Sequence, residues 1–223
     1  MKKCFVLIAI ALVCLALAPF ASADDPKGHF SVHPKTFVGK AGDCGTGYPA
    51  GSEIVTAAWI QGIGLPDNGG ANSNPSNHAD NLNKNDDRNG LLLSKNGATA
   101  DCSAAGADIT GADGAVLTEL GFDIRNGTHC GGGAPRFNVD ASDGFHFVGN
   151  CSAPFANATP APQDPTAWTR LRFDLTQANP PVTPGAKIKS ISIIFDEGTD
   201  GGPGAGLAVI DNVDVNGVLA VKQ

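Results

Sequence analysis

The sequence predicts an all-β protein built as one β-sandwich with long loops. Aspartate outnumbers glutamate by 19 to 3, and glycine and proline together number 44 of the 223 residues. These residue types favour turns, caps and loops over helix interiors. Several short segments alternate apolar and polar side chains with the two-residue period of strands, and no stretch beyond residue 23 repeats apolar residues at helical spacing over three turns.

About nine strands are expected from these alternating segments. They are 28–38 as an edge strand, 53–60, 91–93, 120–125, 136–139, 145–148, 170–175, 191–195 and 207–215. The pattern groups Phe137 with Val139 on one apolar face, and Phe145 with Phe147 on another. Ala141–Gly144 has the composition of a hairpin turn between those two strands. The proline-rich stretch 154–167 is expected to be a loop within one domain rather than a domain boundary.

The first 23 residues have the composition of a secretory signal peptide. Two lysines precede an apolar run of 15 residues, and Ala21-Ser22-Ala23 is a small-residue cleavage site. The run is shorter than the ~20 residues of a membrane span, although a retained anchor is the alternative. Cleavage changes the net charge from −7 to −9 and leaves 24–223 as one secreted domain, extracellular or periplasmic. That acidic balance excludes nucleic-acid binding through a basic surface, and no second apolar run predicts membrane contact.

Four cysteines remain after cleavage, and an even number in a secreted chain predicts two disulfides. They are Cys44, Cys102, Cys130 and Cys151. The open end of the hairpin brings residue 130 close to the residues after 149. The pairing Cys130–Cys151 with Cys44–Cys102 is therefore favoured among the three that four cysteines allow.

The sequence establishes no cofactor; the candidate is a structural calcium ion, and the absence of a bound metal is the alternative. Residues 66–90 hold eight Asn and four Asp, and 80–90 is the part densest in the oxygen ligands that calcium prefers. Asp196, Glu197 and Asp200 place three carboxylates within five residues, with a solvated loop as the alternative. Asp211 falls in the apolar register of the last long strand. It is expected to bind a metal, to be hydrogen-bonded, or to be turned outward by a β-bulge.

A polar face rich in arginine is the expected ligand site. Several charged residues lie opposite apolar neighbours in their strands, and they would share one surface if those strands adjoin. Arginine forks bind carboxylates with two hydrogen bonds, which would suit an acidic sugar, although cross-strand ion pairs on an exposed sheet are the alternative. An aromatic ring beside this face would offer a platform for sugar. The residues proposed to bind the ligand are Asp123, Arg125, Arg170, Arg172 and Trp168.

Two segments near the C-terminus resemble the galactose-binding-like jelly rolls. Residues 168–175 (Trp-Thr-Arg-Leu-Arg-Phe-Asp-Leu) resemble a "W-x-x-v-x-x-d-l" strand of that group, and 209–217 resemble its "iDnv-x-v-x-G" final strand. Segments within 90–95, 120–123 and 129–138 resemble uncharacterised secreted bacterial proteins. The resemblance implies a sandwich of jelly-roll type, which often serves as a carbohydrate-binding module and commonly holds a structural calcium ion.

The sequence favours a secreted, non-catalytic module that binds glycan or another cell-surface ligand. It contains neither a GxSxG nor an HExxH motif. The alternatives are a glycan-active enzyme (a polysaccharide lyase or hydrolase) and a structural surface protein without a small ligand.

Overall fold

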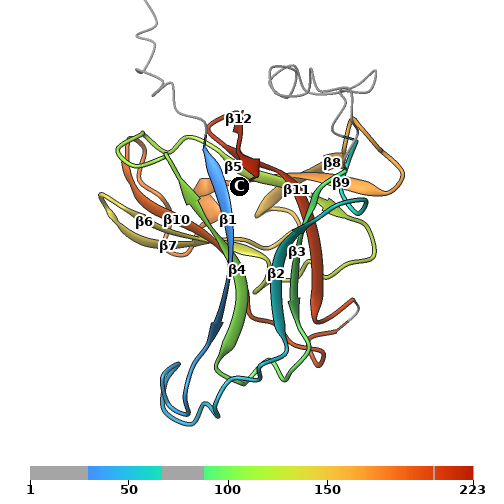
Figure 1. Ribbon diagram of the computed structural model, residues 1–223. Helices are drawn as coiled ribbons and strands as arrows, with labels where there is room; N and C mark the ends of the chain where they lie inside the picture. The colour runs from blue at the N-terminus through green and yellow to red at the C-terminus, as the bar shows by residue number, and fades with distance from the viewer. Residues whose placement is uncertain (1–29, 67–87, 203, 223) are drawn as a thin grey trace, which may run out of the picture.

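The protein folds as a β-sandwich of jelly-roll type (Figure 1). The computed structural model describes residues 30–66, 88–202 and 204–222. Within them, six strands form one sheet in the order β13-β1-β4-β10-β6-β7. The second sheet has seven strands, in the order β2-β3-β11-β5-β9-β8 with β12 paired to β11. From β3 to β11 the chain alternates between the two sheets, as single strands or hairpins, and this alternation defines the jelly roll.

The strands have the following bounds. The six-stranded sheet contains β1 (Ser31–Val38), β4 (Ser103–Thr110), β6 (Arg136–Ala141), β7 (Gly144–Val148), β10 (Ile188–Phe195) and β13 (Val221–Lys222). The seven-stranded sheet contains β2 (Val55–Ile60), β3 (Gly90–Lys95), β5 (Leu120–Arg125), β8 (Ala156–Pro160), β9 (Trp168–Phe173), β11 (Leu207–Val215) and β12 (Val218–Leu219). A 3-10 turn, η2 (Leu175–Gln177), follows β9.

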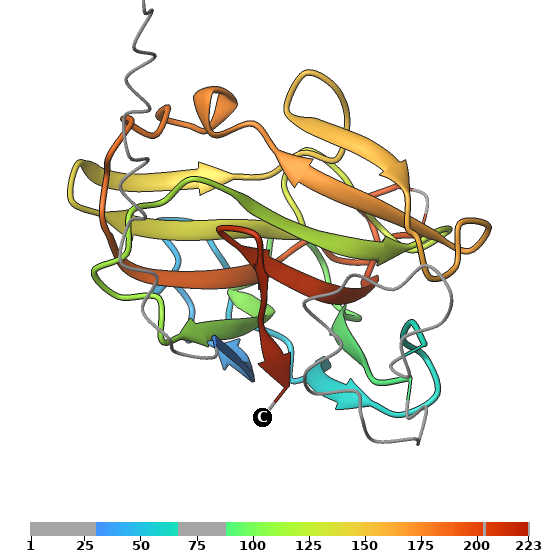
Figure 2. The same cartoon turned by 90° about the horizontal axis from the view of Figure 1, so that it is seen from above.

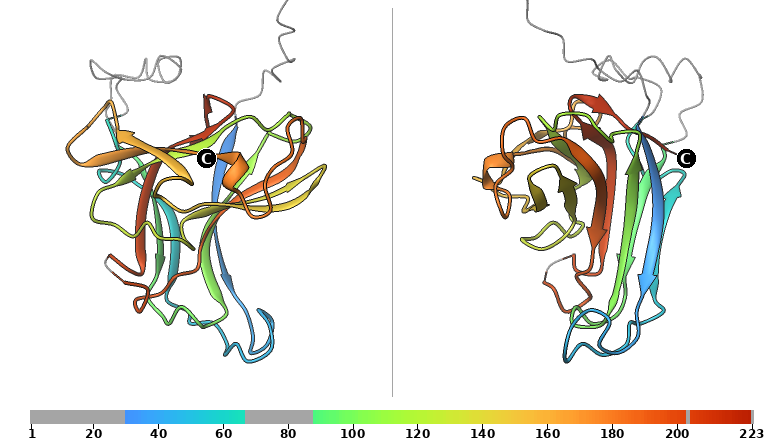
Figure 3. Two further views of the ribbon diagram at one scale, coloured as in Figure 1. Left: turned by 180° about the vertical axis from the view of Figure 1, so that it is seen from behind. Right: turned by 90° about the vertical axis from the view of Figure 1, so that its left-hand side faces the viewer.

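The core lies between the sheets and is built from the alternating residues that the sequence predicts. Phe122 of β5, Phe137 of β6 and Phe173 of β9 are in mutual contact, with ring centroids 5.3–5.8 Å apart. Figure 2 shows β9, β5 and β11 following one another across the seven-stranded sheet. Strands β1 and β2, which belong to different sheets, lie side by side (Figure 3). A hydrogen bond links them, because Trp59 Nε1 donates to Val32 O at 3.2 Å.

Four described strands escape the period-two prediction: the two-residue strands β12 and β13, and the longer strands β4 and β8. Strand β4 (Ser-Ala-Ala-Gly-Ala-Asp-Ile-Thr) buries Ala105, Ala107 and Ile109, and one large apolar side chain is too few to make alternation visible. Gly106 passes so close to the carbonyl of Ile193 that a Cβ would overlap it. Strand β8 lies in the proline-rich stretch expected to be a loop. It is an edge strand ending at Pro160, a position that tolerates proline because no partner needs its missing N–H.

The register predicted for β7 is wrong. Phe145 and Phe147 are exposed, whereas His146 and Val148 are buried. Strand β6 decides this, because Val139 pairs with His146 and Phe137 pairs with Val148, and paired residues share a face. His146 tolerates burial because its two ring nitrogens lie 2.9 Å from Pro180 O and 3.0 Å from Asp143 Oδ1.

Strand β11 contains the β-bulge that was one of the alternatives for Asp211. Its pairing with β5 shifts register between Asp211 and Asp214, and Asn212 takes a positive φ of 47°. Ala208 and Ile210 face the main core before the bulge, and Val213 and Val215 face it afterwards. The predicted register was therefore wrong at Val209, which packs in a second cluster on the outer side of the sheet.

Both favoured disulfides are confirmed. Cys44–Cys102 joins the loop after β1 to the residue before β4, and Cys130–Cys151 joins the loops after β5 and β7. Their Cα atoms lie 5.5 and 5.7 Å apart. The predicted signal peptide lies outside the described residues. Among the residues that are described, none belongs to a helix with the length and apolarity to cross a membrane.

Truncating the aromatic core should destabilise the fold far more than truncating an exposed ring. We expect Phe122→Ala to lower the free energy of unfolding by about 3–5 kcal/mol, because it empties a fully buried site. Phe145→Ala removes the same atoms from a 47% exposed position and should cost below about 1 kcal/mol. Guanidinium unfolding of both variants measures the difference, and equal losses would contradict this description of the core.

Candidate functional site

The outer face of the six-stranded sheet has exposed aromatic rings on β1 and on β7. One cross-strand row consists of His33, Asp108, Ser192, Asn138 and Phe147. The next row is Lys35, Gly106, Ile194 and Arg136. On the two central strands, β4 and β10, these rows place Ser192 and Gly106 beside Asp108 and Ile194. Phe37 on β1 is 51% exposed, and Phe147 on β7 is 43% exposed.

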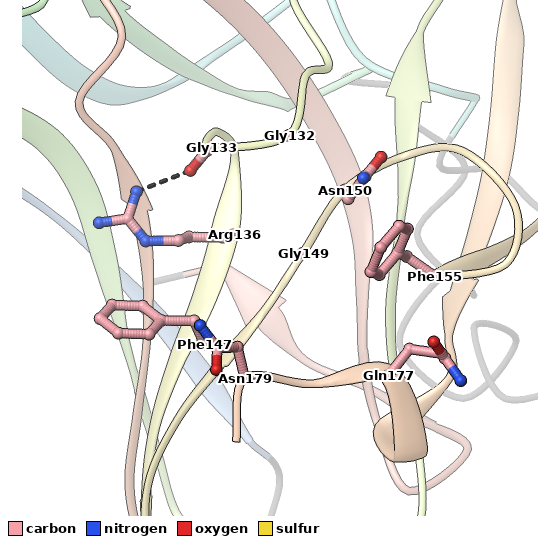
Figure 4. Close-up of a pocket in the computed structure, with 9 residues that line it drawn as sticks. All are labelled: Gly132, Gly133, Arg136, Phe147, Gly149, Asn150, Phe155, Gln177 and Asn179. Carbon is pink, nitrogen blue, oxygen red and sulfur yellow. Dashed lines mark hydrogen bonds between the residues drawn. The ribbon is translucent and has the colours of Figure 1, made fainter. Parts of the chain in front are cut away.

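One end of this face opens into a cavity that we call the amide pocket (Figure 4). Its volume is about 420 Å³. Two aromatic rings line it, together with one guanidinium, three side-chain amides and three glycines. These residues are Phe147, Phe155, Arg136, Asn150, Gln177, Asn179, Gly132, Gly133 and Gly149. Amides both donate and accept hydrogen bonds, so the pocket offers apolar ring surface beside hydrogen-bonding groups of both kinds.

Arg136 is held rigidly at the border of the amide pocket. Its guanidinium donates two bonds to the Asp196 carboxylate at 2.7 and 2.8 Å, and one to Gly133 O at 2.6 Å. Nε donates to Asn138 Oδ1 at 3.1 Å, and the guanidinium carbon lies 5.4 Å from the Phe147 ring centroid. A bidentate pair with a cation–π contact fixes both the arginine and the ring beside it.

A second cavity, the carboxylate pocket, lies on the other side of Arg136. Its volume is about 430 Å³, and it shares Arg136 and Gly133 with the amide pocket. Two aromatic rings, three carboxylates and two hydroxyls are among its lining groups: Phe37, Tyr48, Asp101, Asp196, Glu197, Thr99 and Ser103. Because the two cavities share these residues, we treat them together as one groove.

Each carboxylate of the carboxylate pocket has a basic partner. Asp196 is paired with Arg136, Asp101 Oδ1 lies 2.9 Å from Lys95 Nζ, and Glu197 contacts the ring of His129. Burial would raise the pKa of Asp101, but hydrogen bonds from Ser103, Lys95 and Ser52 outweigh it and hold that pKa well below its usual range. The groove therefore presents carboxylates that each contact a basic side chain.

The segment that carries Gln177 and Asn179 is fastened to the β6–β7 hairpin. Asn179 and Phe147 exchange two backbone hydrogen bonds of 2.9 Å. Thr183 N donates to Asp143 Oδ2 at 2.8 Å, and the other oxygen of Asp143 lies 3.0 Å from His146 Nε2. The Thr183 backbone N–H is the main reason that the pKa of Asp143 lies well below its usual range.

The five residues predicted to bind a ligand lie on the opposite sheet. The structure brings Asp123 and Arg170 together as a bidentate pair with bonds of 2.9 and 3.0 Å, and Asn212 Nδ2 donates to Asp123 Oδ2 at 2.7 Å. Asp123 is fully buried. Burial would lower the pKa of Arg170, but Asp123 raises it above its ordinary value. This pair is the cross-strand alternative that the sequence left open.

The other three predicted ligand residues differ in how much they are covered. Arg172 bridges Glu119 Oε1 at 3.0 Å and Asp214 Oδ2 at 2.9 Å. Trp168 is 3% exposed and packs with Leu65, Ala161 and Val209, so its ring offers no platform for a sugar. Arg125 is exposed, with one 3.4 Å bond to Ile63 O. A ligand role for Asp123, Arg125, Arg170 and Arg172 stays a prediction.

The predicted metal ligands are distributed over two regions. Asp200 accepts bonds from Thr99 N at 2.8 Å and Thr99 Oγ1 at 2.6 Å, which lower its pKa. Asp211 accepts from Leu65 N at 2.8 Å on the outer side of the seven-stranded sheet. Within the described ranges, no group of three or more His, Cys, Asp or Glu side chains is arranged to hold a metal. Most of the predicted 80–90 calcium loop lies outside those ranges, so the calcium ion stays a prediction.

Comparison with known proteins gives little further information. No protein-family model matches the sequence, and no curated protein matches it either. Among solved structures, the chain is similar to the family 11 carbohydrate-binding module of the cellulosomal cellulase Lic26A-Cel5E of Clostridium thermocellum. The identity is 11%, the TM-score is 0.39, and the match covers 90% of this chain and 93% of that one.

Acid should loosen the wall of the amide pocket through Asp143. A lowered pKa means that the ionised carboxylate is stabilised by folding, so its contribution is complete above about pH 4 and is lost as the pH falls below that value. We expect Asp143→Asn to lower the melting temperature at pH 6, and this difference from the native protein to shrink toward pH 2.

Asp113→Asn is the matched control, because Asp113 is an exposed aspartate in another loop. Its effect on the melting temperature should be smaller at pH 6. An effect of Asp143→Asn that stayed constant from pH 6 to pH 2 would contradict the assignment.

Proposed function

We propose that this chain is an extracellular, non-catalytic module that binds glycan in the groove. The supporting observation is the combination of exposed aromatic rings with fixed hydrogen-bonding groups around one groove. Sugars present apolar C–H faces and hydroxyls, so they need both kinds of surface. Phe37, Tyr48 and Phe147 are each at least 43% exposed around the groove, although large apolar side chains usually lie inside a protein.

The polar groups of the groove match a hydroxyl-rich ligand better than a strongly charged one. Asn150, Gln177 and Asn179 supply amides on one side of Arg136, and carboxylate and hydroxyl oxygens accept hydrogen bonds on the other side. Because Asp196 neutralises Arg136, the guanidinium is not an open site for an acidic sugar. An uncharged glycan is therefore the ligand class that the groove favours.

An extracellular location fits the two disulfides, which persist in oxidising compartments. The signal peptide predicted for residues 1–23 supports secretion independently. A non-catalytic role is favoured because the groove carboxylates are engaged by Arg136, Lys95 and His129.

A glycan array probed with purified residues 24–223 tests this function. The labelled protein should stay on spots of uncharged glycan, and the glycans should remain intact over hours. Loss or shortening of a bound glycan would instead identify an enzyme. Failure to bind any spot would favour a structural surface protein and overturn the proposal.

Removing one exposed ring should weaken binding to any glycan found in this way. We expect Phe147→Ala to reduce affinity at least about tenfold, or ~1.4 kcal/mol, because the ring lines the amide pocket and positions Arg136. Isothermal titration with the glycan that scores highest on the array measures this change. The fold should survive, because the ring is 43% exposed.

Arg125→Ala is the control on the opposite sheet, since it removes the exposed arginine of the face that the sequence singled out. Affinity should stay within twofold of the native value. The reverse pattern, with binding lost in Arg125→Ala and kept in Phe147→Ala, would place the ligand on the seven-stranded sheet.

A further inference from the structure

A lysine ammonium lies at the centre of a cage of oxygen atoms at one end of the sandwich. Lys95, the last residue of β3, is fully buried. Its Nζ donates to Thr99 O at 3.1 Å, Asp101 O at 3.1 Å and Asp196 O at 3.0 Å, and it lies 2.9 Å from Asp101 Oδ1. Burial of an ammonium is costly unless its charge is paired and its hydrogens are bonded, and this cage meets both conditions.

The cage joins two chain connections that are far apart in sequence. Thr99 and Asp101 lie between β3 and β4, whereas Asp196 follows β10 directly. Further bonds connect the same segments: Gly198 N donates to Thr99 Oγ1 at 2.9 Å, and Thr199 N donates to Gly97 O at 3.0 Å. The two connections therefore form one unit around Lys95 Nζ.

This unit also carries one wall of the carboxylate pocket. Thr99, Asp101, Asp196 and Glu197 all line that pocket, and the first three supply the oxygens of the cage. Ser52 N donates to Asp101 Oδ2 at 3.0 Å, which attaches the segment before β2. The position of the Lys95 ammonium thus sets the positions of the carboxylates in the carboxylate pocket.

We propose that Lys95 is a tethered cation that organises this end of the groove in place of a bound metal ion. Three backbone carbonyls and a carboxylate are the oxygen types that calcium recruits in proteins. The 2.9–3.1 Å distances are those of N–H···O bonds and not the 2.3–2.6 Å of calcium coordination, because the ammonium fills the centre of the cage. The consequence for glycan binding rests on the function proposed above, whereas the consequence for folding does not.

Chemical rescue tests the need for a cation. Lys95→Ala removes the ammonium and leaves the oxygens of the cage without it. The melting temperature should fall, and ammonium or methylammonium chloride should restore part of the loss. Tetramethylammonium chloride at equal concentration should not, because it has the charge but no N–H donor.

Lys95→Met is the matched variant of similar length without charge. It should lose as much stability as Lys95→Ala and show no rescue, since its side chain fills the cavity. Full native stability in Lys95→Met would overturn the proposal, because the cage would then need no cation. Equal rescue of both variants would also overturn it.

A measurement on the native protein covers the case in which neither variant folds. The buried ammonium of Lys95 should give a slowly exchanging N–H signal in 15N-lysine-labelled protein, unchanged by calcium or by a chelator. Its disappearance on adding calcium would show that a metal displaces the ammonium, and would overturn the proposal. These readouts need no glycan, so they stand if the glycan array is silent. If a glycan binds, a folded Lys95→Ala should bind it more weakly, with affinity recovered in methylammonium.

Discussion

The structure depends on the rule that a charge taken out of water must find a partner. Lys95, Asp101, Asp123 and Asp214 are all buried in a small sandwich, and each is paired with groups from another segment. Burial raises the pKa of Asp214 and opposes its ionisation, although the charge of Arg172 works in the other direction. Because a broken pair would leave a charge unsatisfied, these contacts fix how loops and strands meet.

The same rule makes the two outer faces different. On the seven-stranded sheet, the guanidinium groups of Arg170 and Arg172 form ion pairs with buried aspartates of the protein itself. On the six-stranded sheet, Phe37 of β1 and Phe147 of β7 are exposed on the outer face. Phe147 also lines the amide pocket beside three side-chain amides, so ring surface and amides are open to a ligand there.

Much of the fold could be predicted from sequence because it depends on local patterns. Period-two alternation located β5, β9 and β11 to within two residues, since a half-buried strand must alternate. The cysteine pairing followed from one hairpin, which is also local. Alternation failed at β4, where two alanines and a single isoleucine make the core face, and at β7, where the apolar pattern grouped Phe145 with Phe147. A two-residue turn already implies that Val139 and His146 share a face, so hairpin pairing could have exposed the conflict.

The candidate site could not be predicted from the sequence patterns of individual strands. More than 100 residues of sequence separate Phe37 from Phe147. These two residues and Arg136 come to one face only through the strand order β1-β4-β10-β6-β7. The partners of Asp196, Glu197 and Asp200 likewise come from β6, the loop after β5 and the loop after β3.

The sequence by itself determined the all-β class, most strands and both disulfides. Tertiary structure decided which outer sheet face carries the groove, which partner each charged side chain has, and where the groove lies. Each of these depends on which distant strands become neighbours.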